Sequence, residues 1–237
     1  MRPLIRLLLY RTGLRKASAP PVGYIRRGDF NRTKPFSKKF GFDRGGPVDR
    51  YYIENFLKAN VSSIKGRVLE IGDNEYTLAF GGSAVIKSDV LHVDDKNPKA
   101  TFVGDLSNAP QIPDNIFDCI ILTQTLHLIY NYMDALKTCH RVLKPGGVLL
   151  LTVPGISPIA YDKWGDYWLW SFNKASITRM TSELFSSTGV EVDSYGNVLV
   201  AASFLYGIGL PEMKKEELDY HDPHFQVIIS TKATKPL

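Results

Sequence analysis

Short apolar runs and amphipathic segments alternate along most of the chain from residue 48 onward. Apolar runs of about four to eight residues bounded by turn residues fit strands that are covered on both faces of a sheet. Five such runs occupy residues 67–72, 84–89, 100–103, 117–122 and 148–153. Apolar residues at helical spacing predict helices over 51–57 and 133–142. This alternation predicts a parallel sheet with helices on both faces.

The pattern changes after the fifth predicted strand. Residues 190–192 and 225–231 predict two closing strands, and residues 198–207 predict a helix between them. The Lys-Pro-Gly-Gly segment at 144–147 is expected to end the helix over 133–142. Because no long crossover helix precedes the last strand, that strand can insert antiparallel to the others. The predicted fold class is α/β, with seven strands, mostly parallel, and an antiparallel last strand.

Composition adds a division of charge along the chain. The protein has 237 residues, 44% of them hydrophobic and 22% charged, as in a soluble globular protein. Residues 1–44 carry a net charge of +10, whereas the remainder carries −5. A nucleic-acid enzyme would more often carry its positive field beside the active site, so nucleic acid is disfavoured as a partner. We predict a basic, partly irregular arm over 1–46 and one folded domain over 47–237.

The first seventeen residues alternate arginines with apolar side chains. Arg6 and Arg11 leave only four apolar residues between them, which excludes a secretory signal. The segment suits a disordered extension, a transit peptide, or peripheral contact with an anionic membrane or a partner through residues 1–17. Cys119 and Cys139 lie in apolar runs and are expected to be buried free thiols. A cytoplasmic location is the simplest expectation.

The loop after the first strand carries the first chemical signal. Ligands of open α/β sheets bind outside the carboxyl ends of the strands. Gly72 allows close approach of the backbone to a ligand, and Glu70 and Asp73 suit a cationic amine. A G-x-G-x-x-G phosphate cradle is missing, so the loop favours S-adenosylmethionine over a nicotinamide dinucleotide.

Acidic residues also follow the next two strands. Asp89 stands at the predicted end of the second strand, where a carboxylate can accept both ribose hydroxyls. Asp94 and Asp95 are the alternatives if that strand is longer. Asp105 follows the third strand and can accept a hydrogen bond from the adenine amino group. At the start of the first helix, Arg44 and Arg50 are either surface charges or partners for the methionine carboxylate.

Four segments in this order are similar to the class I S-adenosylmethionine-dependent methyltransferases: 69–72, 103–106, 117–118 and 141–147. The likeness covers about residues 66–155 and extends loosely to the C-terminus. It implies a Rossmann-like fold and S-adenosylmethionine as cofactor. It also implies cofactor-binding roles for the matching residues Glu70, Ile71, Gly72, Asp73, Asp89, Asp105, Leu106, Thr123 and Gln124.

Two further segments, 40–45 and 166–168, are similar to a bacterial subgroup found among polysaccharide and secondary-metabolite enzymes. That similarity implies O-methylation of a sugar or another small-molecule hydroxyl. The chain departs from the family at the second and third glycines of the first motif, where Asn74 and Tyr76 stand, and at Leu169, where an arginine is common. The departures keep open an alternative function, that of a catalytically weak or inactive methyltransferase-fold protein acting as a binding or scaffold subunit.

Three residues are candidate catalytic bases. His127 follows the fourth strand, where the methyl-accepting group would lie, and an imidazole can accept the proton of a hydroxyl. The alternative is a partly exposed histidine on a helix. His221 and Asp222 precede the last strand and are secondary candidates, or else solvated turn residues. No further ligand cluster accompanies them, so no metal site is predicted.

Aromatic residues follow the fifth strand. Tyr161, Trp164, Tyr167 and Trp168 are placed by the topology on the face where ligands bind. Aromatic rings suit a sugar ring or a planar apolar substrate, and they are equally common in packing. We therefore predict a small-molecule or sugar substrate for this region.

Overall fold

The computed structural model describes residue 5, residues 8–9, residue 12, residue 20 and residues 22–237. The chain divides into two compact units, Met1–Pro35 and Phe36–Leu237. Most of residues 1–17, for which a membrane or partner contact was predicted, lies outside the described residues. The predicted domain division at residues 46 and 47 remains a prediction.

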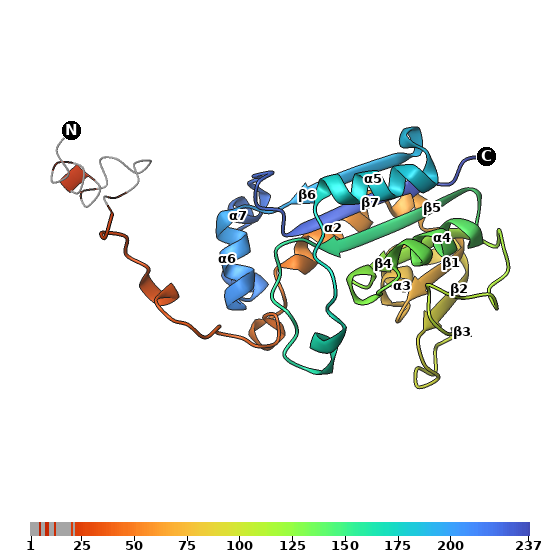
Figure 1. The fold of residues 1–237 in the computed structure, drawn as a ribbon, viewed down its shortest axis with the longest axis horizontal. Helices are drawn as coiled ribbons and strands as arrows, with labels where there is room; N and C mark the ends of the chain where they lie inside the picture. Colours follow the sequence, from red (N-terminus) through yellow and green to blue (C-terminus); the bar gives the residue numbers. More distant parts are fainter. Residues whose placement is uncertain (1–4, 6–7, 10–11, 13–19, 21) are drawn as a thin grey trace. The chain divides into compact units, whose positions relative to one another are not determined.

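Seven strands form one sheet in the order β3-β2-β1-β4-β5-β7-β6 (Figure 1). The strands are β1 (Gly66–Ile71), β2 (Val85–His92), β3 (Phe102–Val103), β4 (Phe117–Thr123), β5 (Leu143–Pro154), β6 (Val190–Tyr195) and β7 (Ile228–Thr234). The first five pair in parallel, and β7 lies antiparallel between β5 and β6. The predicted fold class, including the antiparallel last strand, is confirmed.

Six helices of at least five residues lie in the unit from Phe36 onward. They are α2 (Asp49–Ala59), α3 (Glu75–Gly81), α4 (Tyr132–Val142), α5 (Lys174–Phe185), α6 (Val198–Tyr206) and α7 (Lys215–Asp219). The predicted helices over 51–57, 133–142 and 198–207 correspond to α2, α4 and α6. Within the described part of the chain, no helix is long and apolar enough to cross a membrane.

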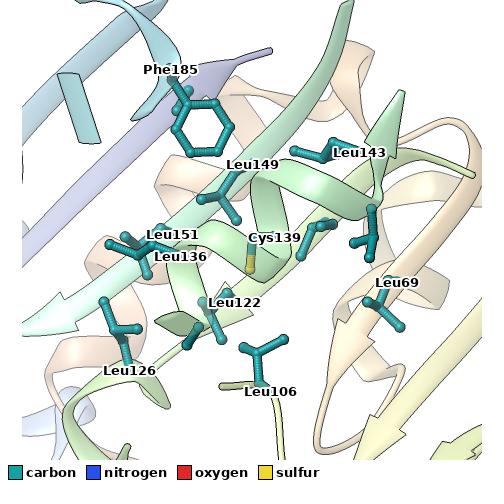
Figure 2. Packing of buried hydrophobic residues seen from close by; sticks show 14 of the residues in the cluster. Leu69, Leu106, Leu122, Leu126, Leu136, Cys139, Leu143, Leu149, Leu151 and Phe185 are labelled. Carbon is teal, nitrogen blue, oxygen red and sulfur yellow. The ribbon is translucent and has the colours of Figure 1, made fainter. Parts of the chain in front are cut away.

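The two faces of the sheet bury separate hydrophobic clusters. Along β4, Phe117 and Leu122 belong to the cluster under α4 and α5, whereas Cys119 and Ile121 belong to the cluster under α2 and α6. Figure 1 shows α4 and α5 in front of the sheet and α2 behind it. Figure 2 shows the first cluster, with Phe185 of α5 near Leu149 of β5. Burial on both faces explains why the central strands are continuously apolar.

Some element boundaries differ from the predicted ones. β5 begins at Leu143 and so includes the Pro-Gly-Gly segment, because Gly146 and Gly147 exchange backbone hydrogen bonds with Lys235 at 2.9 Å. β7 begins at Ile228 rather than at residue 225, because Phe225 donates instead to the Asp222 carbonyl in a turn. β2 runs to His92 rather than ending at residue 89. This last difference changes the site.

Candidate functional site

Glu70 anchors the loop after β1. Its carboxylate, 4% exposed as a residue, accepts hydrogen bonds from the Thr77 backbone N–H and hydroxyl, both at 2.7 Å, and from the Tyr76 N–H at 3.2 Å. Burial raises the pKa of Glu70, and the bonds from Thr77 oppose that rise. The carboxylate therefore satisfies free N–H groups in the first turn of α3 and fixes the path of the loop.

The loop itself leaves room beside its glycine. Gly72 has a φ of 93°, and a Cβ at this position would have no heavy atom within 4 Å. Lys99 Nζ donates a hydrogen bond to Asp73 Oδ1 at 2.8 Å, and this bond lowers the pKa of Asp73. Asn74 Oδ1 is buried without a hydrogen-bond partner among the described residues. An open glycine turn with an unpaired acceptor fits a ligand that brings hydrogen-bond donors.

The placement of Asp89 at the end of the second strand was wrong. Asp89 pairs in register with Leu69 in the interior of β2 and is fully buried. Arg67 Nε donates to Asp89 Oδ2 at 2.6 Å, and Lys87 Nζ lies 3.4 Å from Oδ1. Burial acts to raise the pKa of Asp89, but the bond from Arg67 holds it below its ordinary value. The carboxylate is thus neutralised within the sheet and is not at a strand tip.

Asp94, one of the two alternatives to Asp89, lies at the tip of the second strand. It follows the end of β2 at His92, and its side chain is 41% exposed. Its Oδ1 accepts from the Lys96 N–H at 3.1 Å and lies 3.1 Å from His92 Nδ1. The Lys96 bond lowers the pKa of Asp94, so a carboxylate stands at this tip. Asp95, beside it, is exposed.

Backbone hydrogen bonds hold the tips of β1, β2 and β3 together. The Gly72 N–H donates to the Leu91 carbonyl and the Gly104 N–H to the His92 carbonyl, both at 2.9 Å. Asp105 follows Gly104 and is exposed, with its Oδ1 accepting from the Ser107 N–H at 2.8 Å. The neighbouring Leu106 is a core residue, 3% exposed. The structure therefore brings the loop after β1, Asp94 and Asp105 to one rim.

A cavity of about 680 Å³ lies at the carboxyl ends of β4 and β5; we call it the rim cavity. Its walls come from residues 38–50, from the segment after β4, from residues 157–168 and from α6. Gln124 reaches it from a strained turn with a φ of 46°, held by its N–H bond to the Thr152 carbonyl at 2.9 Å. Thr123, at the end of β4, pairs with Thr152 in the sheet.

His127 forms part of the cavity wall and is only 1% exposed. Neither ring nitrogen has a hydrogen-bond partner among the described residues. The Trp168 ring lies 4.3 Å from it, and Trp168 Nε1 is also buried without a partner. Burial lowers the pKa of His127 to about 4, so the imidazole is neutral at physiological pH. His127 is therefore buried rather than partly exposed, and it lies in the 3-10 turn Leu126–Leu128.

Three of the four predicted aromatic residues line the rim cavity: Tyr161, Trp164 and Trp168. Trp168 stacks on Phe40 with ring centroids 5.7 Å apart, and Lys38 Nζ lies 5.2 Å from the centre of the Tyr161 ring. Tyr167 is exposed and packs edge-on against Trp164 at 6.3 Å. The aromatic segment thus forms one wall of the cavity.

The secondary base candidates lie elsewhere. His221 lines a second hollow, of about 600 Å³, between α2 and the strands β6 and β7, and its Nε2 is 3.5 Å from Ser194 Oγ. Asp222 Oδ1 is bound at 3.0 Å by both the N–H and the Nδ1 of His224. Neither residue lines the rim cavity with His127. Among the described residues, no group of three or more His, Cys, Asp or Glu could hold a metal ion.

The start of α2 supplies two cavity residues, Asp49 and Arg50. Arg44 forms a salt bridge with Glu212, to which it donates through Nε at 2.8 Å and also through Nη2. Arg50 instead donates to the Tyr76 hydroxyl and lines the cavity. Sequence reasoning singled out Arg50 but missed Asp49. The available signal was an acidic residue directly beside that arginine at the start of an amphipathic helix.

Known proteins provide an independent comparison. A family model described as a methyltransferase domain matches residues 78–151. A "Probable S-adenosylmethionine-dependent methyltransferase" of Mycolicibacterium smegmatis is 25% identical over 156 residues, which is 65% of this chain and 52% of that protein. The ubiquinone/menaquinone biosynthesis C-methyltransferase UbiE of Enterobacter sp. is 41% identical over 63 residues, 24% of this chain and 25% of UbiE.

The fold is shared with a crystal structure of a SAM-dependent methyltransferase from Archaeoglobus fulgidus, at a TM-score of 0.53 and 12% identity. That likeness covers 78% of this chain and 94% of the other. The matched chain spans about half the length of the Mycolicibacterium relative and a quarter of UbiE. Together the comparisons support the class I S-adenosylmethionine-dependent methyltransferase family and S-adenosylmethionine as the cofactor.

Proposed function

We propose that this protein is an S-adenosylmethionine-dependent methyltransferase that acts on a hydroxyl of a sugar or another small molecule in the rim cavity. One observation carries the proposal. Buried polar atoms without partners, on His127 and Trp168, line a cavity of about 680 Å³ at the strand ends of a methyltransferase fold. Such atoms lose free energy unless a ligand or water pairs with them.

The cofactor would occupy the rim next to this cavity. Asp94 can accept the ribose hydroxyls, Asp105 the adenine amino group, and the Gly72 turn allows close approach of the backbone. Thr123 ends β4, and the next residue, Gln124, lines the cavity. When bound there, S-adenosylmethionine supplies a methyl group on an electron-poor sulfonium.

The chain's own residues then orient the acceptor. Neutral His127 can accept a hydrogen bond from a hydroxyl, and Trp168 Nε1 can donate a hydrogen bond to a neighbouring oxygen. Tyr161 and Trp164 offer aromatic faces to a ring. Because methyl transfer from a sulfonium is intrinsically favourable, positioning can supply much of the rate acceleration, and a strong base is unnecessary.

Titration calorimetry of the full chain with S-adenosylmethionine, S-adenosylhomocysteine and NAD tests the cofactor. We expect the first two to bind and NAD to give no heat of binding. The alternative function, a scaffold of the same fold, is favoured by Asn74 and Tyr76 at glycine positions of the motif. Binding of none of the three ligands would favour the scaffold, and binding of NAD alone would contradict both functions.

Replacing His127 by alanine is expected to slow methyl transfer about tenfold or more, because the acceptor hydroxyl loses its hydrogen-bond acceptor. Affinity for S-adenosylhomocysteine should change by less than about twofold, since His127 lies on the acceptor side. The rate of S-adenosylhomocysteine formation measures the first effect and calorimetry the second. His224→Ala is the matched control, because that side chain is 85% exposed and does not line the cavity. An unchanged rate in His127→Ala would remove His127 from the reaction.

A further inference from the structure

Asp49 is a carboxylate with an unmet hydrogen-bonding requirement. It lines the rim cavity, and its Oδ1 is buried without a partner among the described residues. Burial raises the pKa of Asp49 to about 6, although Arg50 beside it favours the charged form. A buried carboxylate oxygen in this condition is costly to the folded protein unless a donor reaches it. A cationic N–H donor on a ligand would satisfy it best.

Arg50 is a cation without a carboxylate partner. Its guanidinium bonds to the Tyr76 hydroxyl and lies 5.4 Å and 5.9 Å from the ring centres of Tyr76 and Phe42. No described carboxylate forms a salt bridge with it, in contrast to Arg44, which is paired with Glu212. A guanidinium offers five N–H donors, so most of its bonding capacity remains for a bound anion.

Tyr76 ties this pair to the loop after β1. Its backbone N–H donates to the carboxylate of Glu70, near the end of β1, and its hydroxyl accepts a hydrogen bond from Arg50. The same cavity is lined by Gln124, from the segment that the family resemblance assigns to the methionine part of the cofactor. The opposite charges of Asp49 and Arg50 therefore lie where the cofactor rim and the cavity meet.

We infer that Asp49 and Arg50 form a receptor for a zwitterion, the amino-acid end of the cofactor. Arg50 binds the α-carboxylate and Asp49 binds the α-ammonium. The ammonium and the carboxylate of an α-amino acid are attached to one carbon, and the two opposite protein charges, Asp49 and Arg50, line one cavity. This inference rests on the proposed function, because it assigns residues to the cofactor that the function requires.

Two ligands that differ only in this end test the inference. S-Adenosylhomocysteine carries the amino-acid group, and 5′-methylthioadenosine lacks it. In calorimetry with the full chain at pH 7.5, Arg50→Met and Asp49→Asn should each weaken S-adenosylhomocysteine binding about tenfold or more. Both variants should bind 5′-methylthioadenosine within about twofold of the unmodified chain, because that ligand makes no contact with the pair.

A matched control comes from the same helix. Lys58→Met removes an exposed charge near the other end of α2 and should leave the affinity for both ligands unchanged. Asp49→Asn removes a buried charge, so its thermal midpoint at pH 7.5 should be no lower than that of the unmodified chain. This midpoint shows that a loss of affinity does not come from unfolding.

The pH dependence of binding gives a second readout. As pH falls from 7 to 5 through the pKa of Asp49, S-adenosylhomocysteine affinity should drop about tenfold, because the ammonium needs the carboxylate form. Asp49→Asn should flatten this dependence, and 5′-methylthioadenosine should show none. The other charged or titratable groups near Asp49 come from three places. Arg50 and Glu54 lie on α2, Tyr76 lies on α3, and the cavity lining adds Lys38, Lys39, His127, Tyr161 and Asp162. His127 stays neutral over this range, because burial lowers its pKa to about 4.

Each outcome decides the matter. Equal losses for both ligands, or unchanged S-adenosylhomocysteine binding in both variants, would overturn the receptor while leaving the proposed function intact. A loss confined to Arg50→Met would assign the carboxylate to Arg50 and reject Asp49. Failure of both ligands to bind the unmodified chain would instead reject the proposed function, and the receptor with it.

Discussion

Replacing Leu122 by alanine is expected to lower the free energy of unfolding by about 3–5 kcal/mol, the range for a fully buried leucine whose cavity cannot collapse. Leu122 lies in β4, near the middle of the sheet order, and is 0% exposed. It lies in the cluster with Leu106, Leu126 and Leu136 (Figure 2). Strands on both sides and α4 above prevent the neighbours from closing the gap. Urea unfolding followed by circular dichroism measures the change.

The matched control is Leu78→Ala. Leu78 belongs to α3 and is 63% exposed, so the same substitution removes little buried surface there. Alanine is also the better helix former, and the change should stay within about 0.5 kcal/mol. Similar losses at the two positions would contradict the placement of β4 in the interior of the sheet.

The central strands could be predicted because burial on both faces leaves a direct trace in the sequence. The sequence of β4 is Phe-Asp-Cys-Ile-Ile-Leu-Thr. Its only charged residue, Asp118, lies outside the hydrophobic clusters and forms a salt bridge with Lys144 Nζ at 2.8 Å. The antiparallel last strand was predicted because the sequence showed no long crossover helix before it. Helix α5 was missed although Asn173 and Ser176 form a reciprocal capping box at its start. Those two residues alone resemble an ordinary polar loop.

The end of β2 could not be predicted, because its interior contains a charge. Asp89 interrupts the apolar pattern, and only the fold shows that Arg67 from the adjacent β1 neutralises it. Cross-strand pairs of this kind depend on register, which short apolar runs specify poorly. The preferred residue for the strand tip, Asp89, was therefore wrong, whereas Asp94, one of the two alternatives, directly follows the strand.

The burial of His127 and Asp49 could not be predicted from the sequence. His127 was identified by its place after β4, yet its pKa depends on its burial in the fold, next to the Trp168 ring. Asp49 was missed because an acidic residue in the first turn of a helix is ordinarily a surface residue that favours the helix dipole. Only the folded structure shows that one oxygen of this carboxylate is buried without a partner.

Tyr76 shows how a departure from a motif can have a structural use. A glycine at this position would leave the Arg50 guanidinium without the hydroxyl that now bonds it. The substitution therefore supplies a side-chain contact between α3 and α2 that the usual glycine could not make. It reduces the weight of the missing glycines as evidence for an inactive protein, since the turn at Gly72 keeps its left-handed backbone.

Replacing Asp94 by asparagine is expected to weaken S-adenosylhomocysteine binding about 10- to 100-fold, because two ribose hydroxyls would lose charged acceptors. The same substitution at Asp89 should leave that affinity within about twofold, since Asp89 is occupied by Arg67 inside the sheet. Calorimetry on the two folded variants measures the difference. Loss of affinity in Asp89→Asn with none in Asp94→Asn would restore the sequence-based assignment and contradict the rim described above.

The effects of the two substitutions on stability should have the opposite order, with the larger loss for Asp89→Asn. Asp89→Asn is expected to lower the free energy of unfolding by about 1–3 kcal/mol, less than for a fully buried pair because the Arg67 side chain is 28% exposed. Asp94→Asn should lower the free energy of unfolding by less than about 0.5 kcal/mol, because the Asp94 side chain is 41% exposed. The pKa of Asp89 is lowered in the folded protein. Its contribution to stability is therefore complete above the pKa of the unfolded chain, near 3.9, and is lost as pH falls through the pKa of the folded protein. The difference in free energy of unfolding between the unmodified chain and Asp89→Asn should therefore persist from pH 8 to pH 5 and decrease only in stronger acid. Urea unfolding at pH 7, 5 and 3 measures this difference.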